Sequence, residues 1–561
     1  MRNLSERFMA EEVLKRKATA VLEEALKALL GTKTFIADTS FRSLLDVLAC
    51  GIGGKAYFDS LEISRILLLE SPLPRSSLLD SHVFLLLRPR PTNVLLLKEL
   101  VLGSPQVKFT VAWVPTCTTQ CDLEMERQGL KGLVDEINLP LYLLPCEENV
   151  WSLCRENDFL PLFIEKDYNL VTEVVKSLLE IGLTRSTYFH ALGNVSESCK
   201  ILFESIQSKV PPSNTTLPIT FDQCVFIDRT EDPITLLVTP LHYEGLLDAV
   251  LGMNHGVVVN KGTKHMLTSQ DEFYSTIRDL DFDHLATIKL PTIAIGLRDD
   301  KQTAPVTELA SRIGSLVKTK QHLALHLELA GEITAASTHD HNAVKRCVEI
   351  EQSIMGLGKP RDIETMIEES LFRDPPLELS KMIKLLCLQA LVLDGSEKKA
   401  FEQRQHQLCH TYGYKILPLL SVLTSSLQWL VPKGGNPDWK WSKLRKSMDL
   451  LKGQPIEDIL NPQDIWGMFP TIGYAPLSVR RVQLAVGMKQ LNSLQLPTGS
   501  SSNKLTAHQT ILVYYVGGVT YAELAAYRYL NDSQTKFTFV VATTSICNTT
   551  RLLQGLMTTS V

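Results

Sequence analysis

Residues 224–252, CVFIDRTEDPITLLVTPLHYEGLLDAVLG, decide how the chain is organised. The apolar run 224–227 ends at Asp228 and Arg229, which is typical of a buried strand that delivers two charges to the carboxyl edge of a sheet. Together with Asp232, these charges could form an acid cluster for chemistry or an ion pair between domains. An arginine between acids at a strand end favours the ion pair.

The second half of this stretch predicts a helix. Pro233 prevents a simple continuation of the strand after the acidic turn. Thr239 precedes Pro240, a pattern that indicates an N-cap followed by proline at the first helical position. Apolar residues then recur at helical spacing until Gly252, which can end the helix. The sequence therefore predicts a strand joined to a helix through a charged corner.

Length and composition limit the possible classes of protein. A chain of 561 residues should form two to four domains. A formal net charge of -5 argues against nucleic-acid binding by the whole molecule. No run approaches the ~18 apolar residues of a membrane span, and residues 1–30 lack a signal-peptide pattern. Eleven cysteines spread along the chain favour reduced thiols, so we expect a protein that is neither secreted nor membrane-spanning.

Two parallel sheets are predicted. Strand-length apolar runs alternate with helical segments in the first 145 residues, which is typical of a doubly wound α/β layer. These runs are TFIAD (34–38), RILLLE (65–70), VFLLLRP (83–89), KFTVAWVP (108–115) and LPLYLLP (139–145). The same alternation continues to Arg229 and builds a second sheet.

Between about residues 271 and 451 helical patterns dominate, and strands return only at 510–518 and 537–544. Because two late strands cannot make a sheet alone, we expect them to complete the second sheet around a helical insertion. The predicted fold is α/β with an α-helical insertion and two doubly wound, mostly parallel sheets. The predicted domains are 1–146, then 147–240 with 472–561, and an insertion at 241–471.

Patterns that could indicate nucleotide chemistry are incomplete. GIGGK at 51–55 lacks the first glycine and the Ser or Thr of a phosphate-binding loop. The adjacent glycines Gly517 and Gly518 do not form a dinucleotide fingerprint, and GxSxG is absent. Thr520 and Glu523 instead predict a helix capping box. We therefore predict no catalytic residue and no cofactor.

Metal-binding patterns are equally incomplete. Cys117 and Cys121 have helical spacing but no second pair at a zinc-like separation, and Cys146 and Cys154 lie too far apart in sequence to supply it. The histidines His322 and His326 lack neighbouring cysteines and are expected to be solvated on a helix. We therefore predict no metal site.

Several ordered motifs resemble the SM family, the Sec- and Munc-type proteins that clasp SNARE helices, and in particular its vacuolar protein sorting thirty-three branch. The motifs are DRTEDPITLLVTPLHYEGLLD (228–248), SKMIKLLCLQAL (380–391), TIGYAPLSVR (471–480), LVYYVGGVTYAELAAYRYL (512–530) and VVATTSICNTT (540–550). The resemblance covers essentially the whole chain and implies a three-domain arch.

The resemblance implies a SNARE chaperone that acts in membrane fusion at the late endosome, lysosome or vacuole. Its implied partners are syntaxin-type and R-type SNAREs and a helical solenoid subunit of a HOPS or CORVET tethering complex. The implied location is cytoplasmic and peripheral on membranes, through these partners. Two alternatives stay open: an α/β enzyme that binds a small ligand at the crevice of the sheet, and a tethering scaffold without SNARE affinity.

The resemblance also implies SNARE-binding residues. Asp38 and Arg42 match an acid and an arginine that help to hold a syntaxin-type helix, although Asp38 could instead cap the next helix. Helix 306–334 matches half of a helical hairpin that templates SNARE assembly. Its basic side carries Arg312, Lys318, Lys320 and His322, beside an apolar stripe of Ile313, Leu316, Val317, Leu323, Leu327 and Leu329. The alternative is a solvated helix face.

Two further sets of residues follow from the same resemblance. Trp441 and Leu444, three residues apart on one predicted helix face, match apolar anchors for the solenoid subunit, provided that they are exposed. If they pack inward, they belong to the core. The corner that joins the middle domain to the helical domain is assigned to Asp228, Arg229, Asp232 and Tyr243.

Overall fold

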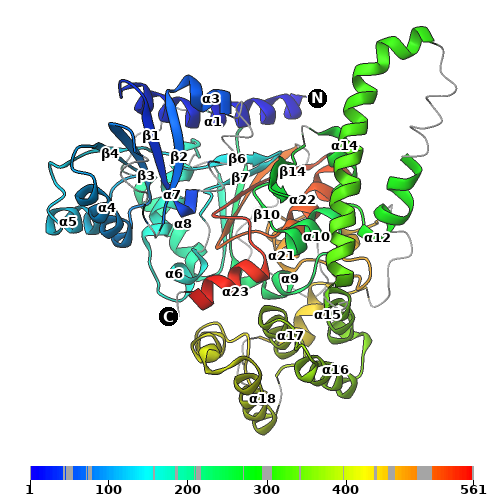
Figure 1. Cartoon of the computed structure of the whole chain (residues 1–561). Coiled ribbons are helices and arrows are strands. Elements are labelled where there is room, and N and C mark those ends of the chain that lie inside the picture. Colours follow the sequence, from blue (N-terminus) through cyan, green and yellow to red (C-terminus); the bar gives the residue numbers. More distant parts are fainter. Residues whose placement is uncertain are drawn as a thin grey trace.

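The computed structural model shows two sheets with flanking helices and a mainly helical part below them (Figure 1). It describes residues 2–41, 55–70, 79–155, 158–183, 187–207, 217–269, 271–293, 306–339, 343–395, 397–434, 439–452, 462–488 and 508–558, with a few single positions between these ranges. Arg42 and the GIGGK motif, except its lysine, lie outside the described residues.

The first sheet has five parallel strands in the order β2-β1-β3-β4-β5. They are β1 (Lys33–Asp38), β2 (Ile63–Leu69), β3 (His82–Leu87), β4 (Lys108–Trp113) and β5 (Val134–Asn138). Helices α1 (Arg2–Lys27), α3 (Lys55–Ser60), α4 (Pro91–Gly103) and α5 (Thr119–Arg127) accompany it. Buried apolar clusters lie on both faces, as expected for a doubly wound layer.

The prediction of the fifth strand at 139–145 is wrong. The strand is β5 at the edge of the sheet, where Val134 is buried and the other four residues are half-buried or exposed. Its Glu136 accepts a hydrogen bond from the Trp113 indole of β4 at 3.0 Å. Pro140 has no backbone N–H for a ladder, and residues 139–143 instead cross to the second sheet, where the next strand begins at Leu144.

The second sheet has six strands in the order β6-β7-β14-β13-β9-β8. They are β6 (Leu144–Glu147), β7 (Val150–Ser152), β8 (Tyr188–Leu192), β9 (Gln223–Asp228), β13 (Gln509–Val516) and β14 (Phe537–Thr543). Only the β6–β7 pair is antiparallel. Strands β13 and β14 lie inside the sheet, so the prediction that late strands complete it is confirmed.

Strand β13 shows why the second sheet is buried on both faces. Leu512, Tyr514 and Val516 belong to the apolar cluster on the side of α7 (Asn169–Glu180) and α8 (Asn194–Gln207). The alternate residues, such as Val513, belong to the cluster that continues into the helical part. This period of two is the pattern of a strand covered on both sides. The other helices beside this sheet are α6 (Phe159–Phe163), α21 (Leu477–Ala485), α22 (Tyr521–Ser533) and α23 (Thr549–Thr558).

The helical part contains most of the remaining elements. Its helices include α11 (Glu272–Ile277), α12 (Phe282–His284), α14 (Val306–His339), α15 (Ala343–Gln352), α16 (Pro360–Phe372), α17 (Leu379–Val392), α18 (Lys398–Tyr412), α19 (Leu417–Ser421) and α20 (Trp441–Ser447). It also has a small antiparallel sheet of β10 (Met253–Asn254), β11 (Val257–Asn260) and β12 (Thr263–Met266), which was not predicted.

Helix α14 is the longest described element. Its 34 residues span about 50 Å at 1.5 Å per residue. Figure 1 shows its C-terminal end beside α15 and its N-terminal end extending past the sheets. The helix therefore has an anchored half and a projecting half.

The single helix predicted from Pro240 is replaced by two helical segments, one that begins before this residue and one that begins after it. Asp232 and Pro233, rather than Thr239 and Pro240, are the N-cap and first residue of a short helix, α9 (Pro233–Leu237). The next helix, α10 (Tyr243–Leu246), has His242 as its N-cap. Thr239 instead donates its hydroxyl to Glu351 in the helical part. Gly252 does end the helical segment, with a φ of 77°.

Candidate functional site

The charged corner at the end of β9 is buried. Asp228 accepts hydrogen bonds from the backbone N–H groups of Val195 and Ser196 at 2.9 and 2.8 Å, so its carboxylate caps the start of α8. Burial raises the pKa of Asp228 to about 6, although the hydrogen bonds from Ser196 and Val195 oppose the rise. A side chain at Gly193 would meet this carboxylate, because its β-carbon would lie 2.2 Å from Asp228 Oδ2.

Arg229 pairs with Glu523 rather than with the helical part. The guanidinium Nη1 lies 2.6 Å from Glu523 Oε2, and neither side chain contacts solvent. Glu523 also completes the predicted capping box with Thr520 at the start of α22. The ion pair therefore joins β9 to a helix almost 300 residues later, which corrects its assignment as an interdomain pair: both partners belong to the second sheet and its helices.

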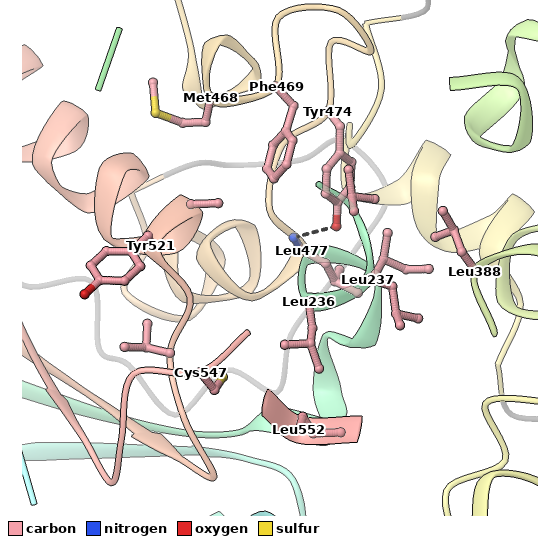
Figure 2. Packing of buried hydrophobic residues seen from close by; sticks show 14 of the residues in the cluster. Leu236, Leu237, Leu388, Met468, Phe469, Tyr474, Leu477, Tyr521, Cys547 and Leu552 are labelled. Carbon is pink, nitrogen blue, oxygen red and sulfur yellow. Dashed lines mark hydrogen bonds between the residues drawn. The ribbon is translucent and has the colours of Figure 1, made fainter. Parts of the chain in front are cut away.

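Asp232 connects two helix starts. It accepts from Thr235 N in α9 at 2.9 Å and from Ser478 N in α21 at 2.8 Å. Beside it, the Tyr474 hydroxyl lies 3.0 Å from Thr235 Oγ1 and accepts from Leu477 N at 3.3 Å, the bond drawn in Figure 2. Figure 2 also shows Leu236 and Leu237 packed around this point. The corner is a structural joint with its polar groups directed at one another.

A second joint connects the corner to the helical part, and the sequence did not reveal it. Glu351 at the end of α15 is buried and accepts from Thr239 N and Thr239 Oγ1, both at 2.8 Å. Lys384 of α17 lies 2.8 Å from the same carboxylate. A glutamate within a helix gives no sequence signal for such a role, so only the packed structure identifies it.

Tyr243 lies at the base of the long helix. Its hydroxyl lies 2.9 Å from His326 Nδ1 on α14, and the His326 ring stacks on Tyr274 of α11. His326 Nε2 faces the Asp271 carboxylate at 3.6 Å. Because a carboxylate only accepts, the proton belongs on Nε2 and Tyr243 donates to Nδ1. The prediction of a solvated His326 is wrong, since this histidine is buried.

Asp271 lies beside both His322 and His326 of α14. Its carboxylate caps α11 by accepting a hydrogen bond from Phe273 N at 2.9 Å. The partly exposed His322 ring forms a second hydrogen bond with the same carboxylate. Burial alone would raise the pKa of Asp271, but the neighbouring His326 and His322 imidazoles lower it well below its usual range. An aspartate directly before the α11 pattern is an N-cap signal that sequence analysis could have used.

The remaining basic residues of α14 differ in position. Lys320 is half-buried and already interacts within the chain. Arg312 and Lys318 lie in the N-terminal half of α14, and their side chains are outside the described part of the structure. Of the predicted apolar stripe, Leu323 and Leu329 are buried, whereas Leu327 is 42% exposed and does not pack inward. The SNARE contacts of this helix stay predictions.

Asp38 is buried at the end of β1. It accepts from Ser40 N at 2.9 Å and from the Asn93 amide at 2.5 Å. The bond from Ser40 N caps the short turn Thr39–Phe41 that follows the strand. The alternative that Asp38 caps the next helix stays a prediction, because that helix lies almost entirely outside the described residues. The contact of Asp38 with a syntaxin-type helix stays a prediction, as does that of Arg42.

The exposed position predicted for Trp441 is wrong. Its indole is 1% exposed and packs near Tyr474, with ring centroids 6.3 Å apart. The helix α20 is short, and its first residue turns into the core that supports the corner. Leu444, one turn later, is half-buried, so only this member of the pair keeps accessible surface.

A cavity of about 340 Å³ lies at the carboxyl ends of β13 and β14, where doubly wound sheets bind ligands. Gly517, Ser545 and Cys547 line it, and its described lining residues include no histidine. Burial raises the pKa of Cys547 to about 12, so this cysteine is a thiol at neutral pH. No activated nucleophile is present among the described lining residues.

Comparison with known proteins agrees with this architecture. The model of the Sec1 family matches residues 45–555. Vacuolar protein sorting-associated protein 33A of Rattus norvegicus is 24% identical over 97% of each chain, and the vacuolar protein-sorting-associated protein 33 homolog of Arabidopsis thaliana is 26% identical over 81% of this chain and 82% of its own.

Solved structures with the same fold include the Unc18–syntaxin 1 complex from Monosiga brevicollis, with a TM-score of 0.60 at 12% identity, covering 97% of this chain and 98% of that one. The SM protein Vps45 in complex with the Qa SNARE Tlg2 gives a TM-score of 0.58 at 16% identity with the same coverage. No helix in the described part of the chain is long and apolar enough to span a membrane. The Sec1 family model matches most of the chain, and the two sheets with a helical insertion agree with this match. The chain therefore belongs to the Sec1 family.

Proposed function

We propose that the chain is a SNARE chaperone of the SM type that promotes SNARE assembly and membrane fusion in transport to the late endosome, lysosome or vacuole. We infer that it is a cytoplasmic, non-enzymatic subunit of a HOPS- or CORVET-like tethering complex and reaches the membrane peripherally through its partners. The observation that carries this proposal is the match over 97% of both chains to a vacuolar sorting protein. Chains of the same fold have been solved with syntaxin-type SNAREs, which supports it.

Helix α14 is the element that we propose for binding SNARE helices. SNARE helices are amphipathic with acidic flanks, so a long helix with basic residues offers both apolar contact and charge complementarity. The base of α14 is fixed by Tyr243 and Asp271, whereas Arg312 and Lys318 lie in the projecting half. A fixed base and a projecting half suit a template along which a partner helix can align.

Titration calorimetry tests the proposal. The purified chain is titrated with the cytosolic domain of a syntaxin-type SNARE and, separately, with an R-type SNARE helix, and a helix of the same composition in scrambled order is the control. We expect saturable binding of the two SNAREs and none of the scrambled helix. Equal heats for all three would contradict SNARE binding and favour the scaffold alternative.

The enzyme alternative has its own test at the cavity between β13 and β14. A thermal shift assay with nucleotides and dinucleotides would reveal a ligand, since a ligand at 100 times its Kd adds about 2.7 kcal/mol of stability. We expect no shift with any member of the panel. A clear shift that Ser545→Trp removes would establish a small-molecule site and contradict a purely binding function.

A further inference from the structure

Two cysteines and a histidine meet in the interior, where the edge of the second sheet contacts the small antiparallel sheet. Cys146 belongs to β6, Cys154 follows β7, and His255 occupies the turn between β10 and β11. All three are buried, and their ligand atoms lie within 4.8 Å of one another. The two cysteines are too far apart in sequence for a familiar zinc pattern, but the β6–β7 hairpin brings them together.

The distance between the two sulfurs suits a shared metal ion. Cys146 Sγ and Cys154 Sγ lie 3.8 Å apart. Two thiolates bound to one tetrahedral zinc, each at about 2.3 Å, would be about 3.8 Å apart. The thiols need no backbone movement to reach this arrangement, whereas a disulfide requires the sulfurs to approach to about 2.05 Å.

The histidine has the proton arrangement of a zinc ligand. Its Nδ1 lies 2.9 Å from Asn254 Oδ1, an amide oxygen that can only accept, so the proton belongs on Nδ1. Its Nε2 then carries a lone pair on the side of the Ser152 hydroxyl, 3.2 Å away. Histidines that bind zinc commonly donate their other N–H to such an acceptor, which fixes the ring. His255 also has a φ of 48°, a conformation that costs energy in most residues and is found at functional sites.

Two other groups in the described part of the chain have comparable spacing, but each is already neutralised by cations. Lys131 lies 2.8 Å from Glu136 in the group with Cys117 and Asp122. Arg528 pairs with Glu244 and Asp279 in the group with His242. Among the residues that the structure describes, no arginine or lysine forms an ion pair with Cys146 or Cys154, and the sulfur and imidazole donors of this group are the ligands that zinc prefers.

We propose that Cys146, Cys154 and His255 bind a zinc ion, with the fourth position beside the Ser152 hydroxyl. The ion links the edge hairpin of the second sheet to the small sheet of the helical part. The same hairpin already holds that part through Glu147, which lies 3.1 Å from Arg278. The metal thus reinforces an existing joint, independently of any SNARE contact.

The first test measures metal in the unmodified full chain. The protein is expressed with added zinc, purified under reducing conditions without chelators, and analysed by elemental mass spectrometry. We expect about one zinc per chain, as for a single site. Replacement of zinc by cobalt should give the thiolate-to-cobalt charge-transfer band and the visible bands of a tetrahedral site. Chain that retains no zinc, or cobalt without a thiolate band, would overturn the proposal.

Variants assign the ligands. Cys154→Ala and His255→Asn should each lower the zinc content at least several-fold, and asparagine is chosen because it tolerates positive φ. Cys387→Ala, which removes another fully buried cysteine from α17, is the matched control and should keep its zinc. Wild-type zinc content in Cys154→Ala would overturn the assignment. If Cys154→Ala does not fold, the cobalt spectrum of the unmodified chain still decides.

Discussion

The corner at the end of β9 and the long helix α14 both carry conspicuous charges, but the charges act differently. Arg229 is buried and committed to Glu523, and this pair joins segments that are distant in sequence. On α14 the half-exposed His322 contacts Asp271 only at the base, and the projecting half has no described partner side chains. Substitutions at the corner should therefore change stability, whereas substitutions on the projecting half should change binding.

The largest effect is expected at the ion pair of the corner. Arg229→Met should destabilise the chain by about 4 kcal/mol, because it leaves Glu523 buried without its cation. Chemical denaturation followed by circular dichroism measures this loss. Arg229→Met combined with Glu523→Gln should recover part of it, since glutamine can still complete the capping box with Thr520. Additive losses in the double variant would show that the two side chains act separately.

A slightly smaller loss is expected from the aromatic layer behind the corner. Trp441→Ala should cost about 3 kcal/mol, because a buried indole leaves a cavity next to Tyr474. Leu444→Ala, on the same helix but half-buried, is the matched variant and should cost much less. Thermal denaturation of the two variants measures the difference. Equal melting temperatures of the two variants would contradict the burial of Trp441 and favour an exposed residue that contacts a partner.

Much of the fold follows from the sequence because long apolar runs have few alternatives. The second sheet was predicted to combine strands from before and after the helical insertion, and β13 and β14 do lie between β7 and β9. The capping box of Thr520 and Glu523 was also predicted correctly from the sequence. The edge strand β5 was missed because an edge strand is only partly covered, so its sequence VDEIN contains three polar residues and forms no apolar run.

The site was less predictable because charge and aromatic character do not determine exposure. Trp441 and Asp38 were predicted to contact partners, yet both are buried and bonded or packed within the chain. The opposite error occurred at His326, which was expected in solvent and is the centre of a buried joint. For each of these residues, contacts with segments distant in sequence determine the exposure, and the local sequence pattern contains no information about those contacts.

The next effect depends on pH. Burial lowers the pKa of His242 to about 4, and its Nδ1 accepts from Gly245 N at 3.1 Å as the cap of α10. Because the folded pKa lies below the unfolded value of about 6.5, the stability from this neutral imidazole is complete above pH 6.5 and is lost as the pH falls towards 4. The loss should reach about 3 kcal/mol at pH 4.

His242→Asn should remove this part of the acid sensitivity while keeping the cap, since an asparagine oxygen also accepts from Gly245 N. Denaturation midpoints between pH 4 and 7 measure the change in slope. A variant whose stability falls as steeply as that of the parent would show that another group causes the acid loss, such as Asp271, whose pKa lies well below its usual range.

A smaller, local effect is expected at the base of α14. Tyr243→Phe removes the hydroxyl that pairs with His326 Nδ1 and should cost about 1 kcal/mol. Hydrogen exchange should become faster around His326 and stay unchanged at the corner. Tyr412→Phe, which removes a hydroxyl bond to the Leu377 carbonyl elsewhere in the helical part, is the control and should leave exchange in α14 unchanged. Faster exchange in α14 with both variants would mean that Tyr243 has no special role in fixing the helix.

The smallest effect on stability, and the largest on binding, is expected from the projecting half of α14. Arg312→Glu with Lys318→Glu should change stability by no more than about 0.5 kcal/mol. The affinity for an R-type SNARE helix should fall several-fold at low salt, and the difference should shrink at high salt because screening weakens the charge contacts. Lys398→Glu with Lys399→Glu on α18 makes the same change in net charge at exposed positions of another helix. If both double variants lose affinity equally, the effect is one of overall charge, and if neither does, α14 is not the SNARE template.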